Sequence, residues 1–205
     1  MPAGVQGRGH RARHRDEVKA RLADALVSLA RERPYATITI EDLTTTAGIS
    51  RSAFYFYYSD KAELLIDAAG EVVQQLFAEA ESFLTADGVD PPSVVHAALA
   101  RNAATFGERG SLMRMTMEVS TYDDRVGEFW TTSLARFTAA VANRIRGDQE
   151  HGLTPADLDP RATGEALVMA TQGYFFRKVS LAGARPEEAV DVLADIWRRV
   201  LYPER

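Results

Sequence analysis

Aromatic side chains fill the positions from Phe54 to Tyr58, inside the stretch GISRSAFYFYYSDKAELL. Arg51 lies shortly before them and Lys61 shortly after. Guanidinium and ammonium groups bind phosphates and guanine edges, and tyrosine hydroxyls donate hydrogen bonds to phosphate oxygens. These residue types at this spacing suit contact with a nucleic acid, although a packed core segment or a stacking platform would use the same rings.

The period of an α-helix separates these side chains into faces. Phe54 and Tyr58 are four residues apart, so they share one face and should pack inward. Arg51 and Tyr55 share another face, which we expect to point outward, and Tyr57 also points away from Phe54. The aliphatic residues that would receive the inward face are Leu22, Leu26, Leu43 and Leu64.

Residues 39–58 predict two short helices joined by a tight turn, Gly48-Ile49-Ser50. Thr39 can cap the first helix with Asp42 as its capping-box partner, and Ser50 can cap the second. In a helix-turn-helix, the first helix crosses the phosphate backbone and the second enters the major groove. We therefore predict DNA contacts from Thr39, Ser50, Arg51, Ser52, Tyr55, Tyr57 and Lys61.

Charge is distributed unevenly along the chain, whose net charge is −5. Residues 1–61 contain ten Lys/Arg and seven Asp/Glu (+3), which leaves 14 and 22 for residues 62–205 (−8). A basic front on an acidic remainder fits a chain whose N-terminal part meets a polyanion, or an arginine-rich tail on an ordinary domain. We interpret residues 1–13 as a flexible basic arm. The arginines of the arm and Arg15 just after it could enter a minor groove, or the arm could be disordered and bind DNA nonspecifically. These arginines are Arg8, Arg11, Arg13 and Arg15.

The remaining pattern predicts an all-α fold of about nine helices. A first helix should run from Arg15 to Arg33, where Pro34 ends it. The strand-like stretch ATITI is short and has no partner strand, so it does not change the fold class. The later helices are expected over 61–84, 91–107, 110–119, 123–150, 160–182 and 186–201. We place a DNA-binding domain at 14–62 and a helical ligand-binding and dimerisation domain at 63–205.

Several classes of protein are disfavoured by what the sequence lacks. There is no cysteine, which excludes disulfides and thiolate metal sites. No apolar run approaches the roughly 18–20 residues that span a bilayer, and the arginine-containing N-terminus has no apolar stretch of a signal peptide. His96 and His151 belong to no catalytic or metal-binding motif. We expect a cytoplasmic protein that is no enzyme, with no cofactor, no metal and no membrane contact.

Large apolar side chains in the C-terminal part fit either an ordinary core or a pocket for a small apolar ligand. Methionine and aromatic side chains provide adaptable apolar surface, and a few polar groups usually orient a bound molecule. A core alone would show the same stripe, so the residues leave both alternatives open. The candidate ligand-binding residues are Phe106, Met113, Met117, Trp130, Phe137, Met169, Gln172 and Phe176.

The last two predicted helices carry small and apolar residues at helical spacing. Such a pair suits a two-fold interface of four helices in a homodimer, because small side chains let helices approach closely. Packing against the subunit's own helices is the competing interpretation. The candidate interface residues are Ala166, Gly173, Val190, Leu193, Ala194 and Trp197.

The helix-turn-helix stretch resembles the TetR family of bacterial transcriptional repressors. The resemblance rests on Ile40, Leu43, Ala47-Gly48-Ile49-Ser50, Phe54-Tyr55, Tyr58, Lys61 and Leu64. More narrowly, GISRSAFYFYYSDKAELL, FWTTSLARFTAAV and DIWRRVLYPER are similar to the EthR-type regulators. The chain departs from the family at Ala53 and Tyr57, where members often carry Thr or Ser and His.

The resemblance implies a homodimer that reads a near-palindromic double-stranded operator through its helix-turn-helix. It also implies dimerisation through the last two helices and a ligand in the C-terminal domain that releases DNA, hence a repressor. A regulator that has lost its ligand response is one alternative. A helical protein-binding scaffold without sequence-specific DNA binding is the other.

Overall fold

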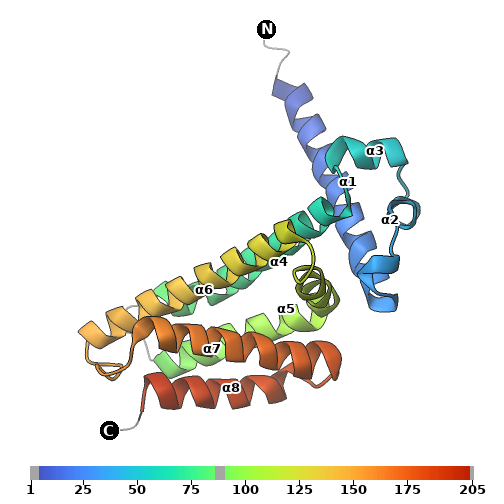
Figure 1. Cartoon of the computed structure of the whole chain (residues 1–205). Coiled ribbons are helices and arrows are strands. Elements are labelled where there is room, and N and C mark those ends of the chain that lie inside the picture. Colours follow the sequence, from blue (N-terminus) through green and yellow to red (C-terminus); the bar gives the residue numbers. More distant parts are fainter. Residues whose placement is uncertain (1–4, 86–90, 204–205) are drawn as a thin grey trace.

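The computed structural model describes residues 5–85 and 91–203, and over these residues the chain is helical with no strand (Figure 1). An N-terminal head is followed by a larger body of long helices. The α-helices are α1 (Val5–Glu32), α2 (Ile40–Ala47), α3 (Arg51–Tyr57), α4 (Lys61–Thr85), α5 (Pro91–Val119), α6 (Asp124–Glu150), α7 (Pro160–Phe175) and α8 (Pro186–Leu201). A 3-10 turn, η1 (Tyr35–Thr37), precedes α2, and a π-helical turn, η2 (Phe176–Leu181), continues α7.

The head consists of α1, α2, α3 and the first turns of α4. Thr39 and Asp42 form the predicted capping box at the start of α2. Gly48 ends α2 in the left-handed conformation, with φ of 62°. A side chain at position 48 would also meet the guanidinium of Arg21, since an added Cβ would lie 2.8 Å from Nη2. Glycine is therefore required at this turn both by its backbone and by its neighbour.

The space beside Gly48 is occupied by the guanidinium of Arg21 from α1. Its guanidinium donates hydrogen bonds to the carbonyl oxygens of Ala47 and Gly48, the latter at 2.9 Å. These carbonyls lie at the C-terminal end of α2, where helix carbonyls lack intrahelical partners and favour a cation. The contact fixes the turn of the helix-turn-helix against α1.

The body is formed by the rest of α4 together with α5 to α8. α4 packs against α5, α6 against α7, and α8 against α5, and α6 runs alongside α4 in Figure 1. One apolar cluster of buried residues runs from Val18 in the head to Leu201 in the body. The head and the body therefore share a continuous core.

Two expectations about the elements are corrected by the structure. Residues 91–119 form one helix, α5, where a break near Gly107 was predicted, so eight α-helices are present in the described residues instead of nine. Gly110 within α5 serves close packing: a Cβ there would lie 2.2 Å from the hydroxyl oxygen of Ser180. The expected flexible arm is helical from Val5, where α1 begins, and residues 1–4 lie outside the described part.

Candidate nucleic-acid interface and ligand cavity

The helix α3 is anchored by its inward face. Phe54 is fully buried and Tyr58, which follows the helix, is 3% exposed, as the four-residue spacing predicted. The Tyr58 hydroxyl donates a 2.6 Å hydrogen bond to Oδ2 of Asp67 on α4, and Lys19 of α1 forms a 2.9 Å ion pair with the same oxygen. Burial, followed by this carboxylate, raises the pKa of Tyr58, so the phenol stays neutral as a donor. These contacts join α1, α3 and α4.

The outward face of α3 is formed by Arg51, Ser52, Tyr55 and Phe56. Tyr55 is 51% exposed and Phe56 is 81% exposed. Phe56 was missed by the sequence reasoning, which expected Tyr57 in the outward set. The spacing contained the signal, because Ser52 and Phe56 are four apart and lie beside the face shared by Arg51 and Tyr55.

Tyr57 lies outside this outward set, and its predicted contact with DNA stays a prediction. Its side chain is partly buried and packs against the apolar core, on the side of the helix opposite the outward set. Its ring meets the Phe56 ring edge-on, with centroids 5.0 Å apart. Tyr57 therefore supports Phe56 from behind.

Lys61, also predicted to contact DNA, has partners within the head, and its contact with phosphate stays a prediction. Its ammonium donates 3.0 Å hydrogen bonds to the backbone oxygens of Tyr35 and Ile38, and it lies 4.2 Å from the centre of the Tyr35 ring. Partial burial lowers the pKa of Lys61. The side chain thus ties the start of α4 to the segment before α2, where the sequence had suggested a contact with phosphate.

Of the remaining predicted DNA residues, Thr39 and Ser50 cap helices with their hydroxyls, and Ser52 contacts the Ser50 hydroxyl. The Thr39 hydroxyl donates to Oδ2 of Asp42 at 2.7 Å and accepts from the Asp42 amide at 3.1 Å. The Ser50 hydroxyl accepts from the Ala53 amide at 3.1 Å and lies 2.9 Å from the hydroxyl of Ser52. All three hydroxyl-bearing residues are exposed, and Thr39 and Ser50 stabilise the starts of α2 and α3 from the surface.

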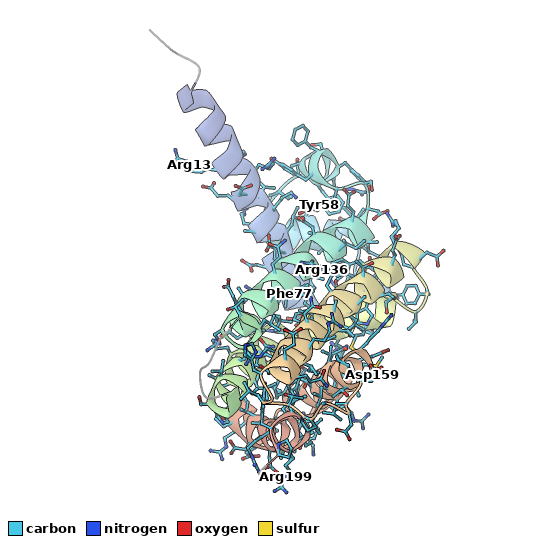
Figure 2. All side chains as sticks on the ribbon, turned by 90° about the vertical axis from the view of Figure 1, so that its left-hand side faces the viewer. Arg13, Tyr58, Phe77, Arg136, Asp159 and Arg199 are labelled. Carbon is cyan, nitrogen blue, oxygen red and sulfur yellow. The ribbon has the colours of Figure 1, made fainter. Side chains whose placement is uncertain are left out.

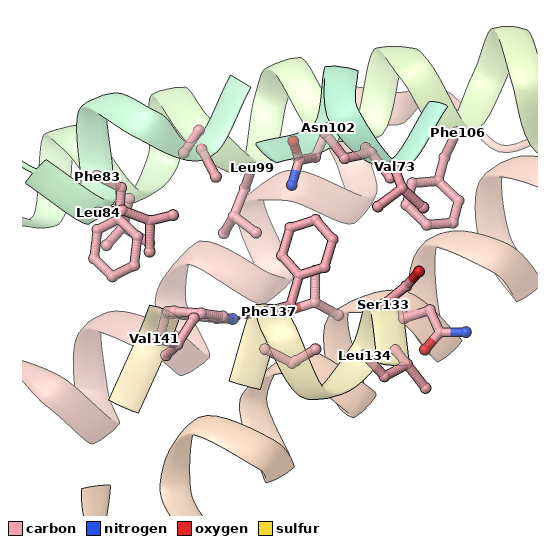
Figure 3. A pocket seen from close by; sticks show the side chains of 18 of the residues that line it. Val73, Phe83, Leu84, Leu99, Asn102, Phe106, Ser133, Leu134, Phe137 and Val141 are labelled. Atoms are coloured by element: carbon pink, nitrogen blue, oxygen red, sulfur yellow. Dashed lines mark hydrogen bonds between the residues drawn. The ribbon is translucent and has the colours of Figure 1, made fainter. Parts of the chain in front are cut away.

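A cavity lies inside the body, enclosed by α4, α5, α6, α7 and α8 (Figure 3). Its volume is about 100 Å³, and its walls are aliphatic and aromatic apart from the side chains of Asn102, Ser133, Thr171 and Gln172. No charged side chain lines it among the described residues. An apolar enclosure with a few polar groups is the usual composition of a small-molecule site.

The structure gathers only part of the predicted ligand set around this cavity. Its lining includes Phe106, Met113, Trp130, Phe137 and Gln172. The others lie elsewhere. Met117 lies behind Gln172, whose amide nitrogen contacts its sulfur at 3.7 Å; Met169 is exposed in a separate surface hollow between α6 and α7; Phe176 belongs to η2 and is absent from the wall.

Stacked rings close one side of the cavity. Phe137 of α6 stacks on Phe77 of α4, with centroids 3.8 Å apart and planes inclined by 17°. The Arg136 guanidinium covers Phe77, 4.8 Å from its centre, and the two residues lie together where α4 and α6 meet (Figure 2). The cavity wall and the helix that enters the head therefore meet at this stack.

The dimer candidates divide between the surface and the core. Ala166 is exposed, Ala194 is partly exposed, and a Cβ added to Gly173 would meet nothing within 4 Å. Val190, Leu193 and Trp197 are buried in the subunit's own core and are corrected on that ground. Trp197 lines the cavity and donates a 2.9 Å hydrogen bond to the Thr171 hydroxyl. The exposed apolar side chains of this region are Met169, Leu181, Val192 and Ile196, of which the last three were missed from sequence.

Two other kinds of feature are absent from the described residues. No helix among them is both long enough and apolar enough to cross a membrane. No group of His, Cys, Asp or Glu side chains within residues 5–85 and 91–203 is arranged to hold a metal ion.

Comparisons with known families match both parts of the chain. Residues 22–68 match the family model described as bacterial regulatory proteins, tetR family. Residues 95–203 match the model described as transcriptional regulator EthR, C-terminal domain. The first range contains α2 and α3, and the second contains four of the five helices that enclose the cavity.

Individual relatives agree with these matches. The HTH-type transcriptional regulator EthR of Mycobacterium tuberculosis (strain ATCC 25618 / H37Rv) is 28% identical over 186 residues, covering 86% of this chain and 83% of that protein. The EthR of Mycolicibacterium smegmatis is 23% identical over 189 residues, covering 91% and 87%. Among solved structures, Salmonella enterica GusR aligns with a TM-score of 0.76 at 16% identity, covering 90% and 95%. The TetR family regulator PfmR from Thermus thermophilus aligns with a TM-score of 0.70 at 19% identity, covering 91% and 96%. These two structures show the same fold.

Proposed function

The chain belongs to the TetR family of bacterial regulatory proteins, with a C-terminal domain of the EthR type, and from this premise we propose that it is a ligand-released repressor. It is a DNA-binding transcriptional regulator. In the proposal, a homodimer binds a near-palindromic operator and leaves it when a small apolar molecule enters the cavity. Its target is chromosomal DNA, so we place its action in the cytoplasm.

The observation that carries the DNA-binding face is the outward side of α3. This helix exposes an arginine and two large aromatic rings. Packing within the chain does not explain that exposure, because packing would cover the rings. Arg51 at the start of α3 can bond O6 and N7 of guanine, and Tyr55 can reach a phosphate or a base. Phe56 can contact the methyl group of thymine. Arg21, which binds the turn before α3, and Asp67, which binds Tyr58 just after it, hold α3 in position.

In the proposal, ligand binding releases DNA through α4, because this helix belongs to both the head and the body. Near its start, Asp67 binds Lys19 and Tyr58 of the head, while Val73, Leu76 and Phe83 further along line the cavity. A cavity of about 100 Å³ is smaller than the roughly 300–1,000 Å³ of typical ligand pockets. A larger ligand must therefore displace wall residues such as Phe137, which stacks on α4 through Phe77. Displacement of α4 would shift the head and therefore the position of α3, its DNA-binding helix.

A second connection supports this route. Arg125, at the start of α6, forms a 2.9 Å ion pair with Asp60, whose other carboxylate oxygen caps α4. Burial acts to raise the pKa of Asp60, but the amide of Glu63 and the Arg125 guanidinium outweigh it and lower the pKa. The carboxylate thus stays charged while it links α6 to α4.

We propose that dimerisation uses the outer surfaces of α7 and α8. Met169 on α7 and Val192 and Ile196 on α8 are exposed apolar residues, and the space outside Gly173 is open. A two-fold axis through this surface would make a four-helix interface that buries these side chains. The distance between the two α3 helices would then set the half-site spacing of the operator.

Capture of genomic DNA fragments by the purified protein tests the proposal. The wild type should retain a small set of fragments that share a near-palindromic sequence. Arg51→Ala should lose them, since a bidentate arginine–guanine contact contributes about 1–3 kcal/mol of discrimination in each half-site. Its melting temperature should not change, because Arg51 is exposed. Retention of the same fragments by Arg51→Ala would contradict the assignment of α3 as the reading helix, and a random fragment set from the wild type would contradict sequence-specific binding.

A further inference from the structure

The outermost position of α3 is occupied by an apolar ring. Phe56 is 81% exposed, the highest value for a large apolar side chain in the part of the chain that the structure describes. It follows the buried Phe54 by two residues, about 200° around a helix of 3.6 residues per turn, so the two rings point in opposite directions. Figure 1 shows α3 on the side of the head that faces away from the body. The Phe56 ring is therefore presented to any molecule that binds this face.

The Phe56 ring is supported from one side by its neighbour. The Tyr57 ring meets it edge-on with centroids 5.0 Å apart, and Tyr57 itself packs against the core. Edge-on aromatic pairs are favourable beyond the area that they bury. The Phe56 side chain thus has a preferred orientation before DNA binds, so less side-chain entropy is lost when the ring makes a contact.

A phenylalanine ring can recognise only one kind of group on a base edge. It has no polar donor or acceptor, so the oxygens, ring nitrogens and amino groups in the major groove offer it no hydrogen bond. The apolar group there is the methyl at C5 of thymine. 5-Methylcytosine carries the same methyl group at the same ring position, whereas uracil and unmodified cytosine carry hydrogen. Phe56 is therefore suited to distinguish pyrimidines by their methyl group.

The polar side chains of the same face lie toward the start of α3. Arg51 is its first residue, and Ser52, one turn before Phe56, has its hydroxyl 2.9 Å from that of Ser50. Hydrogen bonds to base edges are thus available near the start of the helix, and an apolar contact near its end. Both kinds of contact fit within one half-site, so the methyl contact adds to the arginine contact.

We propose that Phe56 makes operator affinity depend on the C5 methyl group of one pyrimidine in each half-site. At this contact thymine and 5-methylcytosine are equivalent, and so are uracil and cytosine. Methylation of a cytosine at this position therefore strengthens binding of the regulator. The inference rests on the proposed function and adds a chemical modification of DNA to which the regulator responds.

Synthetic duplexes of the operator obtained by fragment capture test the inference. One pyrimidine position at a time is changed in both half-sites and carries thymine, uracil, 5-methylcytosine or cytosine opposite its complementary purine. Thymine and uracil form one pair, and 5-methylcytosine and cytosine the other, so the duplexes of a pair differ by the methyl group alone. Fluorescence anisotropy gives the ratio of dissociation constants for each pair, at one salt concentration low enough for every duplex to bind measurably.

In the wild type, one position should show both ratios at about fifteen-fold, because a buried methyl group favours binding by about four-fold and the dimer contacts two of them. In Phe56→Ala both ratios should fall to near one. The two proteins bind the same duplexes, so this difference cannot come from an effect of the methyl group on the DNA itself. Phe56→Leu keeps an apolar side chain and should retain part of each ratio.

Three results would each overturn the inference. The first is that no position shows both ratios in the wild type. The second is that the ratios are the same in Phe56→Ala, since the methyl group would then act through another residue or through the shape of the DNA. The third is that Phe56→Ala weakens binding of all four duplexes by one factor, as loss of a contact with sugar or phosphate would.

Tyr122→Ala is the matched control, because it removes an exposed aromatic ring outside α3. Both ratios should keep their wild-type values in this variant. The melting temperature of Phe56→Ala should equal that of the wild type, since Phe56 is exposed. An operator that is captured but bound without regard to methylation overturns this inference alone, whereas capture of no shared sequence contradicts the proposed function as well.

Discussion

The outer face of α3 and the cavity of the body use aromatic side chains in opposite ways. On α3, Tyr55 and Phe56 project into solvent. In the cavity, rings pack on one another: Phe83 meets Trp197 edge-on with centroids 5.6 Å apart, and Phe137 stacks on Phe77. The same residue types therefore form an exposed surface that we propose binds DNA and a cavity wall that we propose binds a ligand.

The difference shows what decides the role of a ring. On a single short helix such as α3, the position of a residue around the helix axis determines whether its ring is buried, because only the core side of α3 has neighbours. In the body, α5 and α6 have neighbours on several sides, so rings on these helices face the cavity, the core or another helix. Residue type alone carries less information there.

The largest test of this contrast lies within α3 itself. Phe54→Ala should lower the free energy of unfolding by about 3–5 kcal/mol, the usual cost of deleting a buried phenylalanine ring, because Phe54 is fully buried. Phe56→Ala, two positions along, should change it by less than about 0.5 kcal/mol, as surface substitutions do. Denaturant unfolding of both variants measures the difference. Similar losses of stability in the two would refute the assignment of inward and outward faces.

The next largest effect concerns DNA, and it reverses the order of the two faces. Phe56→Ala and Tyr55→Ala should each weaken binding to the captured operator by about ten-fold or more, since loss of a base contact costs about 1–3 kcal/mol. Tyr55→Phe separates the hydroxyl of Tyr55 from its ring. Binding is measured by fluorescence anisotropy at fixed salt. Unaltered affinity in Phe56→Ala would remove Phe56 from the reading face.

The sequence alone predicted the head more fully than the body, for physical reasons. The capping box at Thr39, the glycine turn at Gly48 and the inward pair Phe54 and Tyr58 are local features that depend on few neighbours. In contrast, Val190, Leu193 and Trp197 were assigned to a dimer surface. These residues do form an apolar stripe along the helix. The spacing alone does not distinguish packing on a partner subunit from packing on α5, and in the structure the stripe packs on α5.

Lys61 illustrates the same limit within the head. Position in the motif suggested a phosphate contact, but only the fold brings the carbonyls of Tyr35 and Ile38 within 3.0 Å of its ammonium. Its backbone partners are more than twenty residues away in sequence. No local pattern could have revealed them.

A smaller effect follows from this position of Lys61. Lys61→Met keeps most of the stem but removes both hydrogen bonds, so it should lower the free energy of unfolding by roughly 1–2 kcal/mol, at the low end for bonds to a charged group because the site is partly exposed. The dependence of operator affinity on salt should keep its slope, as no phosphate contact is lost. A slope reduced by about one unit, with unchanged stability, would restore Lys61 to the DNA interface.

The smallest effect is a pKa in the head, where Asp42 closes the capping box of α2. The backbone amide and the hydroxyl of Thr39, with Arg33, lower the pKa of Asp42 from 3.8 to about 2. A depressed carboxyl pKa stabilises the fold above the unfolded value, so this contribution should be complete above about pH 4 and be lost as the pH falls toward about 2.

Thr39→Val removes the hydroxyl bond but keeps the backbone bond, so the pKa of Asp42 should rise only part of the way to 3.8. Titration of the Asp42 carboxyl by NMR measures it. An unshifted pKa in Thr39→Val would mean that the hydroxyl is not held by Asp42 and is available to a phosphate, which would support Thr39 as a DNA contact at the start of α2.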